Sequence, residues 1–147
     1  MPAFGRRSEQ RLITCHESLR LLFRTVVQAR DCAIVCGRRG RDEQERAFDQ
    51  GLSQLHYPDS NHNAEEPELS RAVDVAPWIA GGIPWRDGKA FIYFAGYVSR
   101  VADELGIPVR WGGDWDGDLA LDDQRLNDYP HFELVRGWEP LRHAERV

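Results

Sequence analysis

Apolar residues recur at helical spacing in two long segments of the chain, residues 14–29 and 88–105. Such a stripe is typical of a helix with one face on a core. Thr14 and Glu17 fit a capping box for the first helix, and Gly106 ends the second. The two stripes are Leu12, Cys15, Leu19, Leu22 and Val26, then Phe91, Phe94, Val98, Val101 and Leu105.

Shorter patterns fill the rest of the chain. Residues 42–50 predict a third helix, with Asp42 as its N-cap and Gly51 as its stop. Residues 52–69 form a polar connection, and connections longer than about 12 residues are uncommon unless functional. Four short segments predict strands; they are residues 32–37, 72–76, 107–111 and 131–135.

This order of elements favours a single α+β domain. Strands clustered late in the chain predict a small antiparallel sheet with helices packed on it. A chain of 147 residues is long enough to bury one core, and no change of composition divides residues 1–147. We expect residues 1–10 to be irregular, and both this segment and residues from about 138 to 147 to be peripheral.

Composition and charge narrow the classes of protein. The net charge of −5, without a basic stripe, argues against a nucleic-acid partner. No run approaches the about 18 apolar residues of a membrane span. The first ten residues lack the apolar region of a secretory signal. We expect a monomer without a membrane span, made in a cytoplasm without a signal peptide.

The three cysteines are an odd number for a disulfide framework. Cys32 and Cys36 lie four residues apart in a predicted strand, so both should face one side of it. Their spacing is not that of a zinc knuckle, and no second cysteine pair exists. We expect them to be buried thiols.

Asp74 raises the main chemical question, because it interrupts an apolar strand. A buried carboxylate costs several kcal/mol unless a partner or a metal compensates its charge. One centre containing Asp74, His131 and a histidine of the polar connection would supply the three protein ligands typical of a catalytic zinc. The alternative is a structural ion pair between Asp74 and an arginine, with His131 at the surface.

The segment 128–133 gives the second set of candidates. Pro130 restricts Tyr129 to an extended shape, which holds Asp128 in a rigid approach to the strand. His131 and Glu133 share one face of that strand. Asp128 is therefore placed to shuttle a proton beside a metal held by His131.

Several motifs together resemble one known family; they are CGRRGRDEQERAFDQGLS (36–53), SNH (60–62), SRAVDVAPW (70–78), LGIPVRWGGDWDGD (105–118) and DYPHFEL (128–134). In this order they resemble the phage-type L-alanyl-D-glutamate / D-Ala-D-Ala peptidases, zinc enzymes among the endolysins that cleave peptidoglycan. The resemblance covers residues 12–134. It implies a DD-peptidase/hedgehog-like fold with zinc at the face of the sheet.

The resemblance also implies roles for individual residues. Zinc would be held by His62, Asp74 and His131. Asp128 would act as general base and then general acid. Arg39 would hold a substrate carboxylate or the developing oxyanion through its paired donors.

Two neighbours compete for these roles. His56 lies in the same connection as His62, but only His62 has the Ser-x-His context of the family. Arg38 is the rival of Arg39, and on an extended strand adjacent residues face opposite sides. The residues that we assign to substrate binding are Ser60, Trp111, Trp115 and Glu133. For the two tryptophans, a tight turn with core side chains is the alternative.

The acidic loop 114–123 resembles a calcium loop only in part. Asp114, Asp116 and Asp118 alternate as calcium ligands do, but Gly is absent from position 6 and Arg125 replaces the final Glu. We expect a solvated loop rather than a calcium site.

The function that follows is zinc-dependent hydrolysis of stem peptides in bacterial peptidoglycan, of the L-Ala-D-Glu endopeptidase type. The resemblance implies a phage or prophage endolysin that is made in the bacterial host cytoplasm and acts on the cell wall after release. The alternatives are a D-Ala-D-Ala carboxypeptidase or dipeptidase of the same family, and a zinc-stabilised wall-binding module without turnover.

Overall fold

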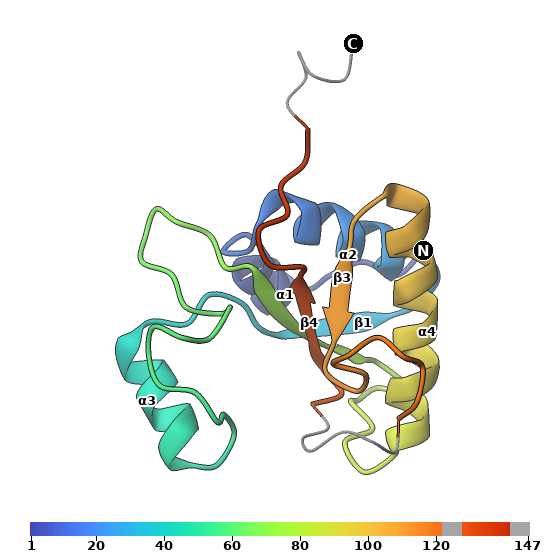
Figure 1. The fold of residues 1–147 in the computed structure, drawn as a ribbon. Coiled ribbons are helices and arrows are strands. Elements are labelled where there is room, and N and C mark those ends of the chain that lie inside the picture. Colours follow the sequence, from blue (N-terminus) through green and yellow to red (C-terminus); the bar gives the residue numbers. More distant parts are fainter. Residues whose placement is uncertain (122–127, 142–147) are drawn as a thin grey trace.

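The computed structural model describes residues 1–121 and 128–141 (Figure 1). Its centre is a four-stranded antiparallel sheet in the order β1-β2-β4-β3, formed by Cys32–Cys36, Ala72–Pro77, His131–Leu134 and Val109–Trp111. The described residues form α-helices at α1 (Arg6–Leu12), α2 (Glu17–Ala29), α3 (Arg41–Asp49) and α4 (Gly88–Leu105). The predicted α+β class with a small antiparallel sheet is confirmed.

The sheet separates an apolar face from a polar one. Helices α2 and α4 contribute most of the helical side chains of the core, and the sheet adds Ile34, Val73, Val75, Phe132 and Leu134. Side chains alternate along each strand, so the strand residues between these apolar ones point to the opposite face. On that face Asp74 lies directly across from His131. The core therefore fixes the face on which the polar residues meet.

Helix α4 has the predicted bounds. The Asp87 side chain accepts hydrogen bonds from the backbone N–H groups of Lys89 and Ala90, and Gly106 closes the helix with φ of 69°. None of the helices in the described part of the chain is long and apolar enough to cross a membrane.

The predicted starts of helices α2 and α3 are wrong. Helix α2 is capped by His16, whose ring accepts from the N–H of Ser18. The Thr14 hydroxyl instead donates to the carbonyl oxygen of Arg11 and accepts from the N–H of Arg38, so it is unavailable as a cap. Helix α3 begins after Gly40, without a side-chain cap, and places Asp42 in its first turn.

Residues 6–12 form a helix, whereas an irregular segment was expected. The hydroxyl of Ser8 accepts from the N–H of Ile34, and the Arg11 guanidinium donates to the Ile34 carbonyl oxygen. These bonds attach α1 to the edge strand β1. They depend on tertiary contact, which the polar sequence of α1 does not reveal.

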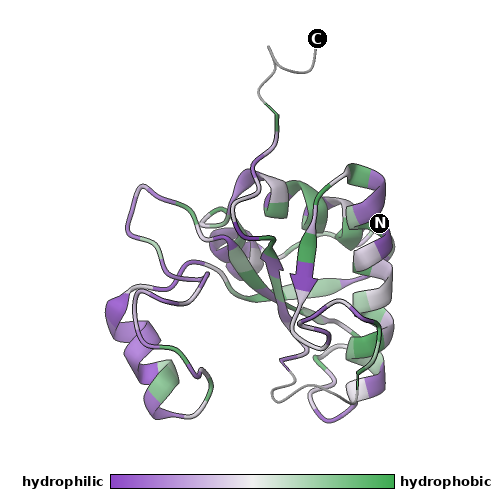
Figure 2. Ribbon diagram, in the orientation of Figure 1, coloured by the Kyte–Doolittle hydropathy of each residue, from purple (hydrophilic) through white to green (hydrophobic). Residues whose placement is uncertain are grey.

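Helix α3 and the connection after it project from the sheet (Figure 1). Residues of both segments line one wall of a cavity. This helix is largely hydrophilic, in contrast to α4 (Figure 2). Its one fully buried side chain is Gln44. A polar helix with a buried amide is unusual for core packing, and Gln44 faces the site described next.

Candidate active site and metal centre

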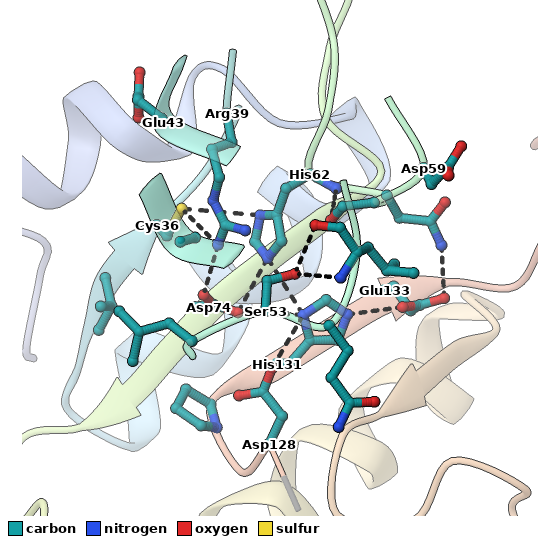
Figure 3. Close-up of a pocket in the computed structure, with 18 of the residues that line it drawn as sticks. Cys36, Arg39, Glu43, Ser53, Asp59, His62, Asp74, Asp128, His131 and Glu133 are labelled. Atoms are coloured by element: carbon teal, nitrogen blue, oxygen red, sulfur yellow. Dashed lines mark hydrogen bonds and ion pairs between the residues drawn. The ribbon is translucent and has the colours of Figure 1, made fainter. Parts of the chain in front are cut away.

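Three possible ligand atoms converge on the polar face of the sheet (Figure 3). His62 Nε2 lies 3.1 Å from Asp74 Oδ1 and 3.2 Å from His131 Nδ1, and the last two atoms are 3.3 Å apart. Zinc bonds of about 2.0–2.2 Å in a tetrahedral shell place neighbouring donors about 3.3–3.6 Å apart. The three separations lie at or just below that range, so the donors would move slightly apart to hold a tetrahedral ion.

The other nitrogen of each imidazole already has a partner. His62 Nδ1–H donates to the Gly37 carbonyl oxygen at 2.8 Å, and His131 Nε2–H donates to Glu133 Oε1 at 2.7 Å. These acceptors fix the tautomers, so the two remaining lone pairs point at Asp74. Histidines that bind metals usually make this outer contact. Three acceptors facing one point require a cation between them.

The carbonyl oxygen that accepts from His62 belongs to Gly37, a position where no side chain fits. A Cβ there would lie 2.4 Å from the Arg11 carbonyl oxygen and 2.5 Å from Thr14 Oγ1. The end of β1 therefore packs directly against the turn after α1. This close approach sets the position of the His62 ring.

The pKa values of the residues at the centre also indicate that a positive charge is needed there. Burial of the imidazole opposes its protonation, but Asp74 outweighs burial and raises the pKa of His62 to about 10. Burial likewise disfavours the Asp74 carboxylate, yet His62 and His131 hold its pKa far below the ordinary value. Without a metal, a proton on His62 supplies the cation. Metal binding must displace it, because ligating imidazoles are neutral.

Asp128 lies beside the centre but is not one of the three close donors. Its Oδ2 is 3.9 Å from His131 Nδ1, and about a third of its side chain is exposed to the cavity. Burial, followed by the negative charge of Asp74, raises the pKa of Asp128 above the ordinary aspartate value. A carboxylate with a raised pKa takes up a proton more readily at neutral pH, as a general base requires.

The backbone holds Asp128 firmly. Its N–H donates to the Gly112 carbonyl oxygen at 2.8 Å, and its own carbonyl oxygen accepts from the N–H of His131 at 3.0 Å. A Cβ on Gly112 would lie 2.0 Å from the Asp128 carbonyl oxygen, so glycine is required for this approach.

Arg39 points toward the same centre. Its Nη2 lies 3.7 Å from Asp74 Oδ2 and 3.6 Å from Cys36 Sγ, and its Nη1 donates to Gln44 Oε1 at 2.8 Å. Arg38 points away and donates to the carbonyl oxygen of Glu68 at 2.7 Å. The geometry thus brings Arg39 into the site and leaves its rival outside.

Gln44 and Asn61 belong to the site although neither was among the predicted site residues. The Gln44 amide accepts from Arg39 and donates to the Leu55 carbonyl oxygen at 2.7 Å, which fixes the guanidinium. Asn61 donates to Glu133 Oε2 at 2.6 Å. Asn61 stands inside the Ser-x-His motif, a usable signal, but nothing in the polar sequence of α3 marks Gln44.

Cys36 lines the cavity, contrary to the expectation that it shares a buried face with Cys32. A bulge between Ile34 and Cys36 shifts the register, so Cys36 lies opposite Asp74. Cys32 stays in the core. Both are free thiols, and Cys36 Sγ is 3.9 Å from His62 Nδ1.

A cavity of about 1140 Å³ surrounds the centre and contains all three candidate ligands. Ser60 and Trp115 line it, and Trp115 packs 5.1 Å from the His131 ring. Glu133 also reaches it, although its buried carboxylate is engaged with His131. Trp111 is not brought to the cavity; its ring stacks on Tyr129 and packs on the core.

Two other sequence candidates lie elsewhere. His56 is exposed, pairs with Glu45 at 2.8 Å and stacks on Phe48, and it is not part of the cavity lining. In the acidic loop, one carboxylate oxygen each from Asp114, Asp116 and Asp118 lies within 4.8 Å of the others. Asp114 is buried, contrary to a solvated loop, and its Oδ1 has no hydrogen-bond partner within the described chain. Arg125 lies outside the described residues.

The fold matches that of a solved enzyme. The Serratia marcescens L-Ala D-Glu endopeptidase ChiX superposes with a TM-score of 0.70 and 29% sequence identity, covering 91% of each chain. Among curated proteins, the L-alanyl-D-glutamate peptidase of Escherichia phage T5 is 31% identical over 146 residues, which cover 98% of this chain and 97% of that protein.

The profile of the family described as phage L-alanyl-D-glutamate peptidase matches residues 2–135. The chain therefore belongs to the phage L-alanyl-D-glutamate peptidase family, and the resemblance seen in the motifs is confirmed.

Proposed function

We propose that this protein is a zinc peptidase that hydrolyses the L-alanyl-D-glutamate bond in peptidoglycan stem peptides. The observation that carries the proposal is the convergence of three acceptor atoms from His62, Asp74 and His131, each imidazole being fixed by a partner on its other nitrogen. The substrate is inferred from the two relatives, which are an L-alanyl-D-glutamate peptidase and an L-Ala D-Glu endopeptidase. The protein would act as a monomeric endolysin that reaches the cell wall after its release from the cell that produces it.

The donor set suits zinc. Two imidazole nitrogens and one carboxylate oxygen leave a fourth tetrahedral position for water or substrate. Zinc bound there would lower the pKa of a water molecule and polarise the scissile carbonyl. The Cys36 thiol lies 3.9 Å from His62 Nδ1, the nitrogen that donates to Gly37, and not beside the Nε2 atom that would bind zinc. We therefore do not include Cys36 in the ligand set.

Asp128 and Arg39 carry the remaining steps. The Asp128 carboxylate takes the proton from the attacking water and delivers it to the leaving amine, so one group serves as base and then as acid. Arg39 lines the cavity with its Nη2 group 3.7 Å from Asp74 Oδ2, and its N–H donors would there meet the oxyanion or a substrate carboxylate. Gln44 keeps that guanidinium in place.

Mass spectrometry of purified peptidoglycan after digestion tests this proposal. We expect new amino termini at D-glutamate, loss of the reaction with a chelator and its return with zinc. Release of terminal D-alanine instead would move the activity to the carboxypeptidase alternative. Binding to the wall without any cleavage would support the module without turnover.

A further inference from the structure

The cavity extends well beyond the three candidate zinc ligands. At about 1140 Å³ it exceeds the about 300–1,000 Å³ of a typical small-molecule site. One of its walls carries Trp85, whose side chain is 57% exposed. Trp85 is one of several exposed large apolar side chains, but it lines the cavity, so a ligand bound there can contact its exposed face.

Trp85 is held as a flat surface. One side of the indole stacks on the buried ring of Phe91, with centroids 5.8 Å apart and planes inclined by 28°. The backbone beneath is fixed, because the N–H of Trp85 donates to the carbonyl oxygen of Ile83 and the N–H of Asp87 to that of Pro84, both at 2.9 Å. The ring is therefore ordered before any ligand arrives, which lowers the entropy cost of binding.

Trp85 and Asp128 both line the cavity. Three residues further on, Gly88 begins α4 directly against Tyr129, since a Cβ on Gly88 would lie 3.3 Å from that ring. Tyr129 follows Asp128 in the chain. The other indole of the cavity, Trp115, already contacts the His131 ring and the Arg110 guanidinium.

We propose that Trp85 is a carbohydrate subsite that stacks on the amino sugar carrying the stem peptide. This inference rests on the proposed function and identifies which part of the wall polymer the enzyme recognises. In peptidoglycan, L-alanine is attached to a sugar through a lactyl group, so only one amino acid separates the scissile bond from the glycan strand. That link spans about 7 Å when extended, about two backbone residues. With the scissile bond at the centre, the sugar ring would therefore lie within the cavity, where Trp85 is part of the lining.

The chemistry of the two surfaces agrees. A pyranose ring presents a face of C–H groups with slight positive charge, and an indole face is electron-rich. Stacking buries both apolar faces while the sugar hydroxyls stay in water. Peptide side chains would not need such a flat exposed ring, and an apolar protein partner would need a larger surface than one indole.

Calorimetry with two product analogues tests the subsite. The probes are N-acetylmuramoyl-L-alanine and N-acetyl-L-alanine, which share the alanine carboxylate and an amide link, whereas only the first carries the lactyl group and the sugar. We expect the wild-type zinc protein to bind the first about tenfold more tightly. Trp85→Ala should abolish this preference and leave the affinity for N-acetyl-L-alanine unchanged, and Trp85→Tyr should restore most of it.

Trp78→Ala is the matched control, because Trp78 is 42% exposed but does not line the cavity. It should keep the tenfold preference. Equal affinities of the wild-type protein for both probes, or an undiminished preference in Trp85→Ala, would overturn the subsite. Hydrolysis of a stem peptide without sugar, measured on the same wild-type sample, tests the proposed function separately. Cleavage of that peptide together with equal probe affinities would reject the subsite alone.

Discussion

Replacing Glu133 with glutamine should weaken zinc binding without removing a ligand. Glu133 Oε1 accepts from His131 at 2.7 Å and Oε2 accepts from Asn61 at 2.6 Å, and the residue is only 7% exposed. An amide has one acceptor oxygen, so in Glu133→Gln either His131 or Asn61 must face an NH₂ donor. The His131 ring then loses its fixed tautomer or its orientation.

Loss of such an outer partner costs about 10- to 100-fold in metal affinity, or about 1.4–2.7 kcal/mol. Competition with a chelator of known affinity, at constant pH, measures the change. Glu139→Gln is the matched control, since Glu139 also pairs with a histidine, His16, at 2.9 Å but at the surface. An unaltered zinc affinity in folded Glu133→Gln, or an equal loss in Glu139→Gln, would refute the orienting role.

Other predictions concern the proton, the guanidinium and pH. Asp128→Asn should keep zinc and the melting temperature but lose about 10²–10⁴-fold in kcat; near-normal turnover would exclude Asp128 as the base. Arg39→Lys should lose about 10²–10³-fold in kcat, because Lys lacks the planar pair of donors, whereas Arg38→Lys should match wild type, and the reverse result would transfer the role to Arg38. In chelator, the contribution of the His62–Asp74 pair to stability should be fully present from the ordinary pKa of aspartate up to pH 6.5. It should be lost as the pH rises through about 10, since His62 then gives up its proton. Zinc should reverse this trend, so the gap in melting temperature between the zinc-bound and chelated protein should widen with pH; a constant gap would contradict proton displacement.

Local patterns predicted the elements that local forces determine. Helix α4 combines a continuous apolar stripe with a strong cap at Asp87 and a glycine stop, so its bounds were readable from the sequence. Asp74 stood out because an isolated carboxylate in an apolar strand needs compensation. The face shared by His131 and Glu133 followed from strand alternation and is present in the sheet.

Features that depend on contacts between distant segments were not predicted. Helix α1 is stabilised by bonds to Ile34, across 23 and 26 residues of sequence. The bulge that turns Cys36 into the cavity reflects the pairing of β1 with β2 and leaves no periodic signal. Spacing alone did not separate His62 from His56, because the path of the connection decides which imidazole reaches Asp74.

The zinc content of three proteins tests the central claim most directly. Wild type, His62→Ala and His56→Ala are purified alike, dialysed against limiting zinc and analysed by elemental mass spectrometry. The account predicts about one zinc per chain in wild type and in His56→Ala, and little in folded His62→Ala, because a catalytic site holds its metal with three protein ligands. Full zinc occupancy in His62→Ala, or loss of zinc in His56→Ala, would contradict the assignment of the centre to His62, Asp74 and His131.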